Sequence, residues 1–75
     1  MYADITADVA RNLKLLDTHG NLVPLDSLMV VDLVMELEAA TGLTIGPEYL
    51  RVEEFESLAT VTALLERLAA QAAKA

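Results

Sequence analysis

The sequence contains no cysteine and no tryptophan, and only two tyrosines and one phenylalanine supply aromatic side chains. Without cysteine the chain has neither a disulfide nor a thiol of its own, so thioester chemistry would need sulfur from a cofactor. Hydrophobic residues nevertheless make up 55% of the sequence, so any core must be aliphatic. No apolar run approaches the length of about 18 residues that a membrane-spanning helix needs.

Basic residues are also scarce, with five lysines and arginines against twelve aspartates and glutamates, a net charge of -7. Such a chain should repel phosphate backbones, which argues against nucleic-acid binding, and should attract partners with basic patches. The first residues lack the basic start and apolar stretch of a signal peptide, so we expect a cytosolic protein that binds no membrane. Because the sequence has 75 residues, we expect a single domain spanning 1–75 with a modest core.

Helical periodicity predicts an all-α fold. The first helix is expected over about Ile5 to Leu16, where apolar residues recur every three or four positions. The turn residues that follow, ending in Gly20, should stop it. Leu22 and Val23 should then pack into the core.

A second helix is expected from Asp26, a strong N-cap, to Ala40 or Thr41, with Gly42 as its terminator. One or two short helical turns should lie between Pro47 and Glu56. The last helix is expected from Leu58 to about Ala72, capped by Ser57, with its apolar residues at helical spacing (Leu58, Val61, Leu64, Leu65 and Leu68).

The second helix is predicted to have two unlike faces. Its core face comprises Val30, Leu33, Val34, Leu37 and Thr41. The opposite face combines Asp32 and Glu36 with large apolar residues (Leu28, Met29 and Met35, with Val31 at the edge). Exposed apolar groups of this kind tend to mark binding sites, although the alternative is packing against a neighbouring helix. Methionine suits a surface that contacts several partners.

Ser27 lies at the start of this helix, and Asp26 should leave its hydroxyl free by taking the capping role. A hydrolytic role for Ser27 is rejected, because the only histidine, His19, lies in a turn and no Gly-x-Ser-x-Gly elbow surrounds the serine. A calcium loop beginning at Asp17 is rejected too, because its sixth and twelfth positions hold Leu22 and Leu28. No other nucleophile, metal cluster or cofactor cradle is evident.

The segment Leu25-Asp-Ser-Leu and the helix through Glu38 resemble the attachment site and recognition helix of acyl and peptidyl carrier proteins. The connector 41–47, the short segment through Phe55 and the helix from Ser57 fit the same family in order and length. The resemblance covers Leu25 to Leu68. It implies a small four-helix bundle, with three main helices and one short helix.

The resemblance also implies a function. Ser27, flanked by Asp26 and Leu28, would carry 4′-phosphopantetheine, added from coenzyme A by a phosphopantetheinyl transferase. Asp26, Asp32 and Glu36 match acidic positions that partner enzymes bind through arginine and lysine, and the apolar residues of the same face (Leu28, Met29, Val31 and Met35) would complete that contact. The chain would be a monomeric, non-catalytic substrate of an acyltransferase, adenylating enzyme or ketosynthase with a basic docking patch.

This sequence departs from the family in two ways. Only 26 residues precede the serine, and Pro24-Leu25 replaces the glycine usual before the aspartate. We therefore expect a first helix that is shorter than usual or tilted.

The cargo is less well indicated. Met29 and Ala39-Ala40 replace carboxylates that would be expected in a fatty-acid carrier, which favours a free-standing acyl carrier in polyketide or related specialised biosynthesis. The charged and aromatic segment 49–55 instead resembles aminoacyl, peptidyl and D-alanyl carriers. A second alternative is an unmodified, acidic helical adaptor that binds other proteins.

Overall fold

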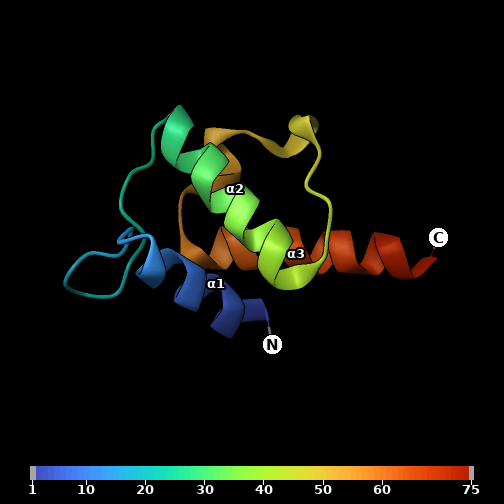
Figure 1. Ribbon diagram of the computed structural model, residues 1–75, viewed down its shortest axis with the longest axis horizontal. Coiled ribbons are helices and arrows are strands. Elements are labelled where there is room, and N and C mark those ends of the chain that lie inside the picture. Colours follow the sequence, from blue (N-terminus) through green and yellow to red (C-terminus); the bar gives the residue numbers. More distant parts are fainter. Residues whose placement is uncertain (1, 75) are drawn as a thin grey trace.

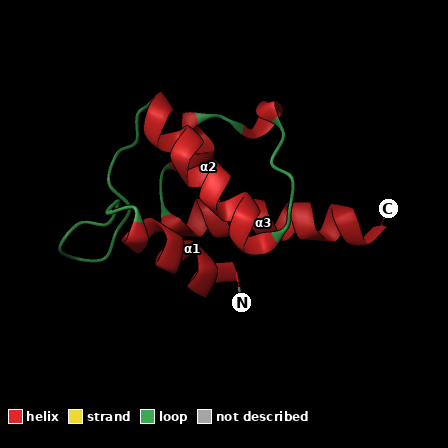
Figure 2. Ribbon diagram, viewed as in Figure 1, coloured by secondary structure: helices red, strands yellow, loops and turns green. Residues whose placement is uncertain are grey.

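The computed structural model describes the backbone of residues 2–74 and the side chains of residues 2–73. Three α-helices, α1 (Tyr2–Asn12), α2 (Ser27–Thr41) and α3 (Leu58–Lys74), are joined by loops and by two short 3₁₀ helices, η1 (Pro47–Tyr49) and η2 (Val52–Phe55) (Figures 1 and 2). The all-α prediction is confirmed, and the two 3₁₀ turns stand where short helical turns were expected. Among the described helices, none combines the length and apolar character needed to cross a membrane.

The first helix ends four residues before the predicted boundary at Leu16, so that part of the prediction is wrong. The helix stops at Asn12, and Lys14 adopts a left-handed conformation with φ of 62°. This turn redirects the chain, so Leu15 is buried and Leu16 forms an isolated antiparallel bridge with Leu22.

The loop from Asp17 to Asp26 is held by its own backbone and by one carboxylate. Oδ1 of Asp17 accepts hydrogen bonds from the backbone N–H groups of His19 and Asn21, at 2.8 and 2.9 Å. The N–H of Val23 donates to the carbonyl of Leu15 at 2.8 Å. As predicted, Leu22 is buried and Val23 packs partly against the core.

The core is aliphatic apart from one aromatic ring. All three α-helices contribute, and the loops add Leu22 and Ile45 while η2 adds Phe55. Most predicted inward positions of α2 and α3 are buried (Val30, Leu33, Val34 and Leu37; Val61, Leu64, Leu65 and Leu68), whereas Thr41 and Leu58 are half-buried. Each fully buried leucine contributes about 1.5–3 kcal/mol relative to an exposed one.

Polar groups next to this core are hydrogen-bonded, as burial requires. Thr6 is fully buried; its hydroxyl donates to the carbonyl of Tyr2 at 2.8 Å and accepts from the Thr62 hydroxyl at 3.3 Å. Thr41 is half-buried, and its hydroxyl donates to the carbonyl of Leu37 at 2.6 Å. These bonds link α1 to α3 and complete the last turn of α2.

The segment between α2 and α3 returns to the start of α2. Gly42 ends α2 in the left-handed region, with φ of 74°, and the chain then runs back through η1 to the level of the first turn of α2 before η2 leads into α3 (Figure 1). A positive φ favours glycine because it has no Cβ to clash. This return path places residues distant in sequence beside Ser27.

Candidate functional site

The start of α2 is capped by a carboxylate. Asp26 is the N-cap in an extended conformation, and its Oδ1 accepts a hydrogen bond from the N–H of Met29 at 2.9 Å. Its carbonyl accepts from the N–H of Val30 at 3.0 Å, which is the first bond of the helical ladder. The predicted cap is confirmed. Ser27 is then the first helical residue, is exposed, and takes no part in this cap.

The other serine of the chain is in a different situation. Ser57 precedes α3 and is half-buried. Its Oγ accepts from the N–H of Thr60 at 3.1 Å, while its own N–H donates to Oγ1 of Thr60 at 3.1 Å. Such reciprocal bonds form a capping box. The predicted cap at Ser57 is present, and it engages the hydroxyl.

A cavity of about 180 Å³ adjoins Ser27. Val30 and Val31 of α2 form one side, and Leu50 and Val52 of the returning segment form the other. Its lining is therefore aliphatic apart from the serine. Sequence reasoning missed Leu50 and Val52; the available signal was two apolar residues within a charged stretch, but their approach to Ser27 depends on the path of the chain.

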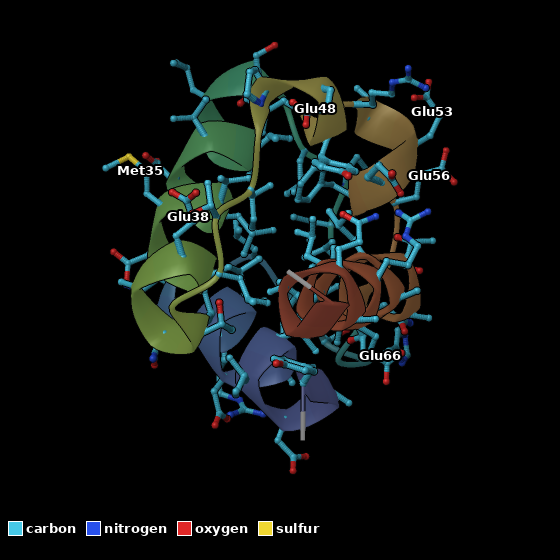
Figure 3. The ribbon with its side chains drawn as sticks, turned by 90° about the vertical axis from the view of Figure 1, so that its right-hand side faces the viewer. Met35, Glu38, Glu48, Glu53, Glu56 and Glu66 are labelled. Atoms are coloured by element: carbon cyan, nitrogen blue, oxygen red, sulfur yellow. The ribbon has the colours of Figure 1, made fainter. Side chains whose placement is uncertain are left out.

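The outer face of α2 is exposed and mixed in character. Leu28, Met35 and Val31 are 77%, 62% and 44% exposed, and Asp32 and Glu36 are exposed as well. Met35 projects from α2 into the surroundings (Figure 3). Together with Leu50 and Val52 these apolar residues form what we call the outer patch (Leu28, Val31, Met35, Leu50 and Val52).

Met29 does not belong to the outer patch. The prediction that it is exposed is wrong, because Met29 is half-buried and packs against the core. It lies at the edge of the buried face, next to Val30. The predicted face is otherwise exposed as expected.

Comparison with known protein families places residues 3–68 in the family described as the phosphopantetheine attachment site. The match spans most of the chain. This protein belongs to the phosphopantetheine carrier family. No curated protein and no solved structure matches it significantly.

Family membership establishes the general function. The protein is a non-catalytic carrier that holds 4′-phosphopantetheine on a serine and serves partner enzymes such as a phosphopantetheinyl transferase. The predicted carrier function is confirmed at this level, and it replaces the alternative of an unmodified adaptor.

The surroundings of Ser27 fit this group. The exposed hydroxyl can be joined to a phosphate without breaking a capping bond, since Asp26 supplies the cap. The first turn of a helix also has free N–H groups and a positive dipole end, which favour a phosphodiester's negative charge. The adjoining aliphatic cavity offers room beside the linkage.

Proposed function

We propose that Ser27 is the attachment serine, and that the chain is a free-standing, single-domain acyl carrier protein serving polyketide or related specialised biosynthesis. When bound, the 4′-phosphopantetheine arm supplies the thiol on which an acyl group is held as a thioester. The chain itself supplies the attachment hydroxyl and a surface for its partners. We further propose that it acts as a monomer in the cytosol.

One observation carries the assignment to Ser27. The sequence contains two serines, and only Ser27 has an exposed hydroxyl that is not engaged in capping. The hydroxyl of Ser57 is bonded to Thr60 at a half-buried position. A transferase must reach the hydroxyl oxygen and remove its proton, so the exposed and unengaged group is the better substrate.

The docking surface proposed for partner enzymes is the outer face of α2. Asp32 and Glu36 supply charge, Leu28, Val31 and Met35 supply apolar contact, and Met29 contributes only through its exposed part. An acidic surface with a small apolar patch suits brief encounters with several basic partners, because charge raises the rate of association. Leu50 and Val52 extend this surface beyond α2.

The aromatic residues in segment 49–55 do not by themselves indicate an aminoacyl cargo. Phe55 is 2% exposed within the core, and Tyr49 is half-buried with its hydroxyl 3.4 Å from Oε1 of Gln71. Packing therefore accounts for both aromatic side chains. The feature that resembled aminoacyl carriers needs no contact with cargo to explain it.

The test is intact mass after incubation with coenzyme A and a permissive phosphopantetheinyl transferase. The native chain and a Ser57→Ala variant are expected to gain one phosphopantetheine, and a Ser27→Ala variant is expected to gain none. Modification of Ser27→Ala, or no modification of a well-folded native chain, would contradict the assignment. Loading the modified carrier with acyl- and aminoacyl-transferring enzymes in parallel would then test the cargo.

A further inference from the structure

The returning segment between α2 and α3 is fixed at several points. Near its start, Oε2 of Glu38 accepts a hydrogen bond from the N–H of Ile45 at 2.8 Å. Near its end, Phe55 inserts into the core. Between these anchors, Leu50 and Val52 remain 41% and 64% exposed while they line the cavity beside Ser27.

One ion pair ties the end of this segment to α3. Nη2 of Arg67 lies 3.0 and 2.9 Å from the two carboxylate oxygens of Glu54. The glutamate side chain is 24% exposed and the arginine side chain 55%. The pair joins residues 13 positions apart in the chain, so it fixes tertiary structure and is not a local contact within one helix.

Glu54 is well placed to orient the cavity wall. It belongs to η2, whose first residue, Val52, lines the cavity and whose last residue, Phe55, is buried. Phe55 anchors the last residue of η2 in the core. The bond from Glu54 to Arg67 adds a second fixed point one residue earlier, in the same short helix that carries Val52.

We propose that Glu54 and Arg67 form a positioning pair, which holds Leu50 and Val52 in the arrangement that a partner enzyme contacts beside Ser27. Neither residue contacts the attachment hydroxyl; both act through the position of the wall. This inference rests on the proposed function, because it assumes that partners approach Ser27.

We expect that the pair can be broken without unfolding the protein. Ion pairs with solvent-exposed members contribute little to stability, and the core beneath η2 does not depend on charge. The informative variants are the single changes Glu54→Gln and Arg67→Gln, and a double variant in which the two charges are swapped (Glu54→Arg with Arg67→Glu). The Asp8–Arg11 pair on α1, with a distance of 2.8 Å, provides the matched control through Asp8→Asn.

Two measurements test the proposal. The first is amide hydrogen exchange at Leu50, Arg51 and Glu54, whose N–H groups are all hydrogen-bonded within the segment. The second is kcat and KM for modification of the carrier by a phosphopantetheinyl transferase, with coenzyme A saturating. We expect the amide hydrogens of each single variant to exchange faster at these positions. We also expect KM to rise roughly two- to fivefold with kcat unchanged, because an exposed ion pair contributes a free energy of this size.

The double variant with the two charges swapped is expected to restore both the amide exchange rates and KM. The control Asp8→Asn is expected to change neither. Unchanged amide hydrogen exchange or unchanged KM in both single variants would overturn the proposal. A charge-swapped double variant that restores neither quantity would overturn it too. Amide hydrogen exchange in this segment can be measured whether or not Ser27 is the attachment serine. Failure of the attachment assignment would therefore appear as modification of Ser27→Ala, whereas failure of the positioning pair would appear as native kinetics in Glu54→Gln.

Discussion

The helices α2 and α3 start from almost the same three residues, Asp26-Ser27-Leu28 and Glu56-Ser57-Leu58, yet their caps differ by one position. In α2 the acidic residue is the N-cap and the serine is the first helical residue. Before α3 the serine hydroxyl makes the capping bond and the leucine is the first helical residue. Because of this shift of one residue, the hydroxyl of Ser27 is free of capping bonds, whereas the hydroxyl of Ser57 caps its helix.

The chemistry of the caps explains the shift. Aspartate is among the preferred N-cap residues because its short side chain reaches the N–H groups of the first turn, whereas the longer glutamate is not. Ser57 also has Thr60 three residues later to complete reciprocal bonds, while the corresponding position after Ser27 is Val30, which has no hydroxyl. The differences between Asp26 and Glu56 and between Val30 and Thr60 together account for which residue caps each helix.

The leucines differ as much as the serines. Leu28 is 77% exposed, whereas Leu58 is half-buried and packs against the core. The start of α2 presents both polar and apolar groups to the surroundings, and the start of α3 uses both for stability. A similar local sequence therefore serves partner contact in one place and folding in the other.

The largest expected effect tests this contrast through stability. Leu58→Ala should lower the free energy of unfolding by about 1–2 kcal/mol, less than the 2–5 kcal/mol typical of a fully buried leucine. Leu28→Ala should change it by less than about 0.5 kcal/mol, as is usual for exposed positions. Urea unfolding of both variants measures the difference. Equal losses would show that Leu28 is as important to the fold as Leu58.

A smaller effect is expected from moving the cap in α2. Asp26→Glu keeps the charge but weakens the capping bond, so the Ser27 hydroxyl should compete for that role. A capping bond is typically worth about 1 kcal/mol, so transferase modification should slow by up to roughly fivefold. Initial rates of mass gain measure this, with Glu56→Asp as the control expected to leave the rate at Ser27 unchanged. A native rate in Asp26→Glu would mean that the capping residue does not determine access to the serine.

These helix starts also show which features the sequence could predict. The boundaries of α2 follow from two strong local signals, an aspartate N-cap and a glycine terminator, and the observed helix ends within one residue of the prediction. The end of α1 has no such signal, because the break depends on a left-handed Lys14, a conformation that lysine rarely adopts. Periodicity continues through Leu16, but in the structure Leu16 instead forms a bridge with Leu22 in the loop after the helix.

The candidate site divides in the same manner. The cap at Asp26 and the exposure of Ser27 could be predicted from local rules, since both depend on residues within one helical turn. The cavity wall from Leu50 and Val52 could not, because it depends on how segment 42–57 folds back over α2. Met29 was misplaced because helical projection alone does not show how far neighbouring elements extend around α2.

The smallest expected effect tests whether acidic residues on α2 differ from those on α3. Asp32 lies on the outer face of α2, and Glu66 is exposed on α3, on the opposite side from Met35 (Figure 3). Asp32→Lys and Glu66→Lys each raise the net charge of -7 by two units, so they are matched in overall electrostatics. If partners dock on α2, Asp32→Lys should slow transferase modification roughly two- to threefold more than Glu66→Lys, because one local contact of modest strength is reversed.

The difference should shrink as salt is added, since exposed charges are screened. Equal slowing in both variants would show that total charge attracts the partner, and that the outer face of α2 is not the docking surface.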